Sequence, residues 1–210
     1  EQVYLSHLGK WSCKHCKIQR PALNFDDKNT TIRPLNGIHN LYNTIGAYAI
    51  CSLIGADETK LKNFAPGFGR SEKLLINNKE IILLLAKNPA SMNANLRFLQ
   101  EKTDVGSLVF VLNDRVPDGH DISWIWDTDL ESLKPYPVFV SGDRAYDMAL
   151  RIKYTSLFQI SNFKFQIQTN LKQALLSALT RVNDNKVLYV LANYSAMLDV
   201  RKTLTGRRIL

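Results

Sequence analysis

The stretch IILLLAKNPASMNANLRFLQE, residues 81–101, contains the unit from which most of this chain is built. Its opening run IILLLA (81–86) is apolar, too short for a helix and suited to a buried strand. Residues 89–101 then carry a helical pattern of apolar positions. A strand followed directly by a helix is typical of sheets whose strands run parallel.

The same unit recurs to the end of the chain. Further strand-length runs occupy residues 107–113, 137–140, 163–168 and 187–192, and helical patterns occupy 143–154, 170–182 and 194–204. This alternation predicts an α/β fold with a mainly parallel sheet covered on both faces. Ligands of such sheets bind at the carboxyl ends of the strands, where we expect KNPASMN, NDRVPDGHD and SGDRAYD to lie.

The first third of the chain lacks this strand–helix alternation. GIHNLYNTIGAYAICSLIG (37–55) has apolar residues at helical spacing and a Gly stop, which predicts a buried helix, and a second short helix is predicted in DETKLKNF (57–64). The Gly/Pro-rich APGFGRSE marks a linker at 65–72 between a unit at 1–64 and an α/β domain at 73–210. Because the first residue is Glu, we expect a fragment of a longer protein.

Composition limits the class of protein. The chain has 210 residues, of which 45% are hydrophobic, and a net charge of +8. Its Lys and Arg residues are spread along the chain, apart from a local cluster at 201–208, so nucleic-acid binding is not favoured over an anionic, phosphate-bearing substrate or nucleotide. No apolar run approaches the roughly 20 residues of a membrane span, and no signal peptide is visible, so a cytosolic protein is expected.

The cysteines leave two readings open. Cys51 lies in the apolar helix and is expected in the core. Cys13 and Cys16 form CKHC, which is half of a four-cysteine zinc ribbon. The second pair is absent, and His7 and His15 could substitute only with a non-standard spacing. The alternative is a hairpin turn with two free thiols.

The segment DGHDISWIWD (118–127) combines carboxylates with two tryptophans. An Asp-Gly start and the absence of strict alternation predict a loop that runs into a short helix. Since it follows a predicted strand, it lies at the functional edge of the sheet. Asp121 could cap the short helix, and Trp124 and Trp126 could anchor an interface or pack against the sheet.

Several of these segments resemble one protein family. GIHNLYNTIGAYA resembles the Gly-x-His-Asn-x-x-Asn helix of the Mur ligases, and FGRSE resembles their inter-domain Gly-Arg segment. LLAKNPASMNANL, NDRVPDGHDISWIWDTDLE, SGDRAYDMALRIKY and YVLANYSAMLDVRKTL are similar to the carboxy-terminal domain of the Mur-ligase-like subunit of lipid II isoglutaminyl synthase. The resemblance implies the end of a Mur ligase central domain with a partial zinc ribbon, then a Rossmann-like carboxy-terminal domain.

The resemblance also implies an activity. It is the ATP-dependent amidation of the D-glutamate α-carboxylate in the lipid II stem peptide to D-isoglutamine, with Mg²⁺ and Zn²⁺ as further cofactors and a class I glutaminase subunit as partner. The enzyme would work at the cytoplasmic face of the membrane and would meet the membrane only through its lipid-linked substrate. The sequence holds no G-x-x-x-x-G-K-[ST] phosphate cradle, so this chain alone is not expected to hydrolyse ATP.

Site residues follow from the matching motifs. Asn40 and Asn43 match the asparagines that read adenine, Arg70 matches the linker arginine that contacts nucleotide phosphate, and Asp121 matches the aspartate that completes the glutaminase Cys–His pair across the interface. The alternatives are asparagines that hold a neighbouring loop, a linker salt bridge, and the helix cap.

Two further positions depend on the same motifs. Cys13 and Cys16 would bind zinc with a CxxC that the family has upstream. Lys87 departs from the family pattern and receives no role.

Three other functions share some of these features. A different Mur or folylpolyglutamate-type ligase would have the Asn-x-x-Asn helix without the Trp-Ile-Trp string. A zinc-ribbon nucleic-acid binder would lose affinity steeply with salt. A structural module would bind the partner without changing its glutamine hydrolysis.

Overall fold

The computed structural model describes residues 3–5, 11–26, 32, 34, 38–64, 67, 69–156, 160, 163 and 165–207. The chain divides into two compact units. One comprises Glu1–Pro34 with Leu41–Asn63, and the other comprises Leu35–Asn40 with Phe64–Leu210. Among the described residues, no helix is both long enough and apolar enough to cross a bilayer.

The first unit combines a hairpin with helices. Strands β1 (Val3–Leu5) and β2 (Trp11–Cys13) pair antiparallel. Helix α1 (Ile38–Ile54), most of which lies in this unit, confirms the helix predicted over 37–55, and the 3-10 helix η1 (Glu58–Asn63) lies in the second predicted segment.

The prediction that α1 is buried is wrong for this chain. Tyr42, Leu53 and Ile54 are 62%, 82% and 72% exposed, whereas Thr44 is buried. Tyr48 packs edge-on against Phe25, with ring centroids 5.7 Å apart. A two-stranded hairpin and one short helix are too small to enclose an apolar helix on every side.

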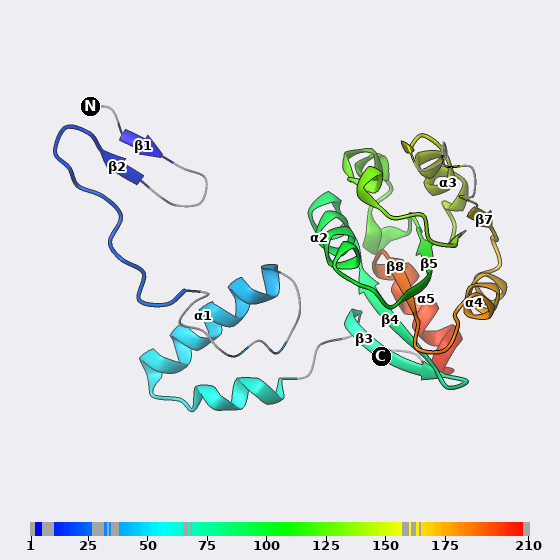
Figure 1. The fold of residues 1–210 in the computed structure, drawn as a ribbon, viewed down its shortest axis with the longest axis horizontal. Helices are drawn as coiled ribbons and strands as arrows, with labels where there is room; N and C mark the ends of the chain where they lie inside the picture. The colour runs from blue at the N-terminus through cyan, green and yellow to red at the C-terminus, as the bar shows by residue number, and fades with distance from the viewer. Residues whose placement is uncertain are drawn as a thin grey trace. The chain divides into compact units, whose positions relative to one another are not determined.

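The second unit is built on a six-stranded sheet with the order β3-β4-β8-β5-β6-β7 (Figure 1). Its strands are β3 (Arg70–Ile76), β4 (Lys79–Leu85), β5 (Val105–Val111), β6 (Val138–Ser141), β7 (Phe165–Ile167) and β8 (Val187–Ala192). Each of the five runs predicted as strands forms one, although β7 is shorter than expected. All pairings are parallel except β3–β4, which confirms a mainly parallel sheet.

Strand β3 is not among the strands predicted from the sequence. It starts at Arg70, inside the range predicted for the linker, and turns into β4 through Asn77 and Asn78. Both asparagines have positive φ, 50° and 61°, as a two-residue hairpin turn requires. The Asn-Asn pair between two short apolar runs was the local signal for this hairpin.

Four helices cover the sheet as predicted. They are α2 (Pro89–Gln100), α3 (Ala145–Lys153), α4 (Leu171–Thr180) and α5 (Tyr194–Thr205). Strand residues alternate between two cores: Ile82 and Leu84 pack with residues of α2 and α3, and Ile81 and Leu83 pack with residues of α4 and α5. Both faces of the sheet are therefore covered (Figure 1).

The segment after β5 consists of loops and short 3-10 helices. These are η2 (Val116–Asp118), η3 (Ser123–Asp127) and η4 (Leu130–Ser132). The predicted loop running into a short helix at 118–127 is confirmed, with 3-10 geometry in place of an α-helix.

Candidate functional site

Two asparagines join the carboxyl ends of β5 and β8. The Asn113 backbone N–H donates to Asn193 Oδ1 over 3.1 Å, and Asn193 Nδ2 donates to the Asn113 carbonyl over 2.6 Å. Both residues are buried, at 1% and 3% exposure. This reciprocal pairing satisfies backbone groups that the sheet leaves unpaired where the strands end.

The Asn113 side chain extends this network to two other segments. Its Oδ1 accepts from the Asp143 backbone N–H over 3.0 Å, and its Nδ2 donates to Ser195 Oγ over 3.1 Å and to Asp199 Oδ2 over 3.4 Å. One buried amide thus links the loop after β6 with the first turns of α5. The ends of β5, β6 and β8 form a single polar edge.

Gly142 allows the loop after β6 to approach β5. Its φ is +98°, and a Cβ there would lie 2.4 Å from the Leu112 carbonyl oxygen and 2.8 Å from Asn113 Oδ1. Only glycine fits, because the two obstructing groups are a backbone atom and a buried amide.

Two arginines form ion pairs with carboxylates along this edge. Arg115 contacts Asp143 and Asp199, each over 2.8 Å, and Arg144 contacts Asp114 over 3.0 Å. The positive charge of each arginine disfavours a cation at the oxygens it contacts. Among the described residues, no group of three or more His, Cys, Asp or Glu side chains is arranged to hold a metal.

The two aspartates of DGHD differ in their environment. Asp118 uses both oxygens internally: Oδ1 accepts from the Ser195 N–H over 2.9 Å, and Oδ2 accepts from the Ser195 hydroxyl. Asp121 is exposed, and its Oδ1 accepts from the Ser123 N–H over 2.8 Å. The structure therefore presents Asp121, and not Asp118, to an incoming group.

The environment of Asp121 favours its ionised form. Hydrogen bonds from the Ser123 backbone N–H and then from its side chain hold the pKa of Asp121 below its ordinary value. The bond from the Ser123 N–H lies at the start of η3, whose N-cap is Ile122 without a side-chain cap bond, so Asp121 does not occupy the N-cap position itself. A carboxylate has about four acceptor positions, so this bond leaves others available.

The two tryptophans of η3 differ in burial. Trp124 is half-buried and packs with Ile122 against the core beneath α2 and α3. Trp126 is 49% exposed, with its ring centroid 5.9 Å from that of Tyr154 and 5.7 Å from the Arg151 guanidinium carbon. Packing against the sheet domain is thus confirmed for Trp124, and Trp126 remains exposed beside the loop of Asp121.

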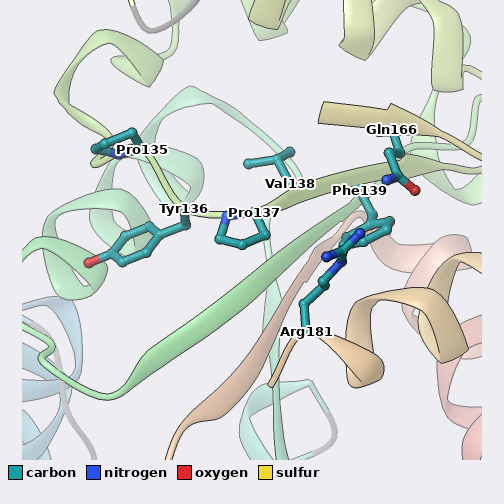
Figure 2. Close-up of a pocket in the computed structure, with 7 residues that line it drawn as sticks. All are labelled: Pro135, Tyr136, Pro137, Val138, Phe139, Gln166 and Arg181. Atoms are coloured by element: carbon teal, nitrogen blue, oxygen red, sulfur yellow. The ribbon is translucent and has the colours of Figure 1, made fainter. Parts of the chain in front are cut away.

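A pocket of about 220 Å³ lies at the opposite edge of the sheet (Figure 2). Pro135 and Pro137 precede β6 and Arg181 follows α4, which places this pocket at the amino ends of the strands. It is smaller than the roughly 300–1,000 Å³ of typical ligand sites. Its residues are Pro135, Tyr136, Pro137, Val138, Phe139, Gln166 and Arg181, and none is a predicted site residue.

The predicted nucleotide residues lie on separate elements. Asn40, which is half-buried, and Asn43, which is exposed, both lie on α1, and Arg70 is the first residue of β3. Lys87 is exposed after β4, where its backbone N–H donates to Ser91 Oγ over 3.0 Å. The assignment of Asn40, Asn43 and Arg70 to ATP stays a prediction.

Cys13 and Cys16 form a tight turn at the end of β2. The Cys16 N–H donates to Cys13 Sγ over 3.5 Å, and this bond lowers the pKa of the Cys13 thiol. His15 is exposed, and no third metal ligand joins the two thiols among the described residues. His7 lies outside those residues. The turn fits half of a zinc site, and the predicted zinc ribbon is not shown.

A family comparison identifies the sheet domain. The family model described as MurT ligase C-terminal matches residues 85–197. The chain belongs to the MurT family. The matched segment runs from the end of β4 into α5, so it includes Asp121, Asn113, Asn193 and Ser195 and excludes Asp199 and the predicted nucleotide and zinc residues.

Individual MurT relatives agree with this assignment. The chain is 30% identical to the lipid II isoglutaminyl synthase (glutamine-hydrolyzing) subunit MurT of Streptococcus pneumoniae, over 97% of the chain and 50% of that protein. It is 29% identical to the subunit of the same name from Staphylococcus aureus, over 73% of the chain and 40% of that protein. The chain spans about half the length of these curated relatives or less.

Solved structures share the fold. A pseudomurein peptide ligase type C from Methanothermus fervidus has a TM-score of 0.59 at 21% identity, covering 98% of this chain and 46% of that one. Folylpolyglutamate synthase from Mycobacterium tuberculosis, complexed with ADP and AMPPCP, has a TM-score of 0.58 at 22% identity, covering 84% and 42%. The α/β fold with a mostly parallel sheet is therefore that of Mur ligase and folylpolyglutamate synthase carboxy-terminal domains.

Some residues of this MurT edge are not predicted from the sequence. Asn193 and Ser195 are absent from the predicted site, although Asn193 directly follows the run predicted as β8. A polar residue immediately after a buried parallel strand was the available signal. The pairing of Ser195 with Asp118 had no local signal, because 77 residues separate them.

Proposed function

We propose that this protein acts as the Mur-ligase-like subunit of a glutamine-dependent lipid II isoglutaminyl synthase. The observation that carries the proposal is the family match over residues 85–197, which includes the exposed Asp121 loop at the carboxyl edge of the sheet. The reaction would convert the D-glutamate α-carboxylate of the stem peptide into the amide of D-isoglutamine. It would take place at the cytoplasmic face of the membrane that holds the lipid-linked substrate.

The chemistry proceeds in two ligation steps and one supply step. The α-carboxylate attacks the γ-phosphorus of ATP, which gives an acyl phosphate and ADP. Ammonia then adds to the acyl carbon, and the tetrahedral intermediate expels phosphate to leave the amide. A partner glutaminase supplies the ammonia by hydrolysing glutamine to glutamate, because free ammonia is mostly protonated at neutral pH.

Asp121 would act in the supply step. A class I glutaminase uses a cysteine nucleophile and a histidine base, and a carboxylate behind the histidine fixes its tautomer and stabilises the imidazolium. Asp121 suits this role because it is exposed and only one of its oxygens has a hydrogen-bond partner among the described residues. Trp126, exposed on the same segment, would lie at the edge of the contact with the glutaminase.

ATP would be bound with the help of Asn40, Asn43 and Arg70. An asparagine amide both donates and accepts, as adenine requires, and a guanidinium suits phosphate. The sequence has no phosphate cradle, so other parts of the ligase would hold the phosphates. Among the described residues, no group of three or more His, Cys, Asp or Glu side chains is arranged to hold the Mg²⁺ that accompanies ATP.

Zinc would be held by Cys13 and Cys16 together with two further ligands. The N–H···Sγ bond within the turn and the lowered pKa of Cys13 favour a thiolate, which is the metal-binding form. Zinc content of the intact ligase, measured for the wild type and for Cys13→Ser, tests this assignment. Equal zinc in both proteins would contradict it.

The test of the main proposal separates the two nitrogen sources. The intact ligase carrying Asp121→Asn is combined with its glutaminase, lipid II and ATP, and amide formation is followed with glutamine or with ammonium chloride. We expect glutamine hydrolysis to fall by roughly 10³- to 10⁴-fold, as for loss of a triad carboxylate elsewhere. Amidation with ammonium should be unchanged. Equal failure with both donors would place Asp121 in the ligase site or in folding.

The shared fold also favours an alternative, an amino-acid ligase of the folylpolyglutamate type. Such an enzyme would join an amino acid to its substrate without a glutaminase. The same assay with ammonium or glutamine replaced by glutamate distinguishes the two: an ATP-dependent product containing glutamate would support the alternative.

A further inference from the structure

Helix α5 receives its cap from a distant part of the chain. The residue at its N-cap position, Asn193, makes no side-chain cap bond, because its amide is bound to Asn113. The Ser195 N–H in the first turn is instead bound by Asp118, which lies 77 residues earlier. A carboxylate is favoured at this place, since the first N–H groups of a helix have no partner within it and carry partial positive charge.

Ser195 is itself held from two sides. Its hydroxyl donates to Asp118 Oδ2 and accepts from Asn113 Nδ2 over 3.1 Å. Ser195 is only 6% exposed and Asn113 only 1%. Asp118 is therefore attached to a buried part of the sheet edge, although it belongs to a surface loop.

This attachment lies close to Asp121 along the chain. Only Gly119 and His120 separate the two aspartates, a stretch that spans at most about 10 Å. On the other side of Asp121, Ile125 is completely buried and Trp124 packs against the core. The exposed carboxylate thus lies between two fixed points, while the Gly119 backbone turns with a φ of +78° between them.

We propose that Asp118 is a positioning residue for Asp121: its bonds to Ser195 fix the loop so that the Asp121 carboxylate meets the histidine of the glutaminase. The inference rests on the proposed function. A carboxylate that must orient an imidazole on another chain depends on its backbone, because a misplacement of about 1 Å can cost 10²-fold in rate. Asp118 has no contact with the reacting groups and acts only through this loop.

The test uses the intact ligase in complex with its glutaminase. Asp118→Asn keeps the shape of the side chain and removes its charge, and Ser195→Ala removes the hydroxyl donor while the backbone N–H remains. For both variants we expect kcat for glutamine hydrolysis to fall by roughly 10- to 100-fold, with KM for glutamine unchanged. Amidation with ammonium chloride should stay at the wild-type rate.

A matched control separates positioning from stability. Asn170 caps α4 in the same domain through a bond from the Gln173 N–H of 3.0 Å. Asn170→Ala removes a cap of the same kind far from Asp121 in sequence, and it should leave glutamine hydrolysis unchanged. If Asn170→Ala and Asp118→Asn reduced hydrolysis equally, Asp118 would be a structural cap only and the proposal would be overturned.

A double variant gives the decisive readout. In the Asp121→Asn background, adding Asp118→Asn should cause no further loss of glutamine hydrolysis, because there is no carboxylate left to position. Independent, additive losses would overturn the proposal, as would a matching loss of ammonium-dependent amidation. If Asp121→Asn alone kept full glutamine hydrolysis, the role proposed for Asp121 would be wrong. A normal rate in Asp118→Asn alone would instead overturn only the positioning role proposed for Asp118.

Discussion

At the scale of single residues, chemically identical side chains have different roles because their partners differ. Asp118 and Asp121 are three positions apart, yet one is bound through both oxygens to Ser195 and the other is exposed. A carboxylate that binds a group on another molecule must be exposed and must keep acceptor positions unused. Asp121 is therefore the candidate for contact with the glutaminase because of its exposure and its few partners, and not because of its residue type.

Gly142 gives the first prediction at this scale. Gly142→Ala should lower the free energy of unfolding by roughly 3 kcal/mol, because a positive φ and a backbone clash are imposed together. Gly206→Ala is the control, since Gly206 has a φ of +70° with nothing within 4 Å of an added Cβ. It should cost about 1–2 kcal/mol. Urea unfolding measures both, and equal losses would show that the loop after β6 can move away.

Glu131 gives a prediction for pH. The Arg151 hydrogen bond lowers the pKa of Glu131 from its ordinary 4.5. A lowered folded-state pKa means stabilisation that is fully present above pH 4.5 and is lost as pH falls through the lower folded value. Since the Glu131 side chain is 47% exposed, Glu131→Gln should cost under about 1 kcal/mol at neutral pH. Urea unfolding of both proteins should show this difference shrinking toward acid; a difference that grows would contradict the pairing.

At the scale of elements, helix α3 supplies a buried arginine that binds the irregular segment after β5. Arg151 of α3 is 4% exposed and donates to the carbonyls of Ile125 and Thr128 over 3.2 and 2.6 Å. Its guanidinium also contacts Glu131 over 2.9 Å. One buried side chain therefore satisfies backbone groups of a segment that has no sheet partner.

Replacement of Arg151 tests this arrangement. Arg151→Lys keeps the charge but cannot reach several acceptors with a planar fork, so it should cost roughly 2–3 kcal/mol of stability. Arg97 on α2 provides the control, since it is mostly exposed on its helix and Arg97→Lys should be nearly neutral. Thermal unfolding compares the two. Similar melting temperatures for both variants would mean that the guanidinium bonds of Arg151 contribute little to holding the segment.

At the scale of the whole molecule, the sheet domain includes the hairpin strand β3. Residues 80–84 of β4 have partners in both β3 and β8, and Ile81, which faces α4 and α5, is completely buried. Lys79, at the start of β4, donates to the carbonyls of Leu179 and Val182, each over 2.8 Å. The hairpin thus belongs to the sheet on one side and to the end of α4 on the other.

The domain boundary is tested with two fragments. We predict that residues 67–210 fold independently and cooperatively, whereas residues 77–210, which lack β3, leave the edge of β4 unpaired and unfold at a lower temperature. Circular dichroism during heating of each fragment gives the comparison. Limited proteolysis of the whole chain should cut on the amino-terminal side of Arg70. Equal melting temperatures would place the boundary after β3, near the position predicted from the sequence.

The sequence by itself determined the elements that bury side chains on regular faces. The runs of β4, β5 and β8 and the patterns of α2 and α5 could be predicted because burial imposes a spacing that is visible locally. The motif around Asp121 was visible for a different reason, because its residues are contiguous in the sequence. Strand β3 was not, because an edge strand with one exposed side has a mixed composition.

The tertiary structure alone decided which polar groups meet. Asn113, Asn193, Ser195 and Asp118 form one network only because β8, the last strand in sequence, inserts between β4 and β5 and brings α5 beside the loop after β5. Periodicity records which face of an element is buried, but it contains no information on strand order. Hydrogen bonds between residues 77 to 82 positions apart depend on that order, so they could be established only from the folded chain.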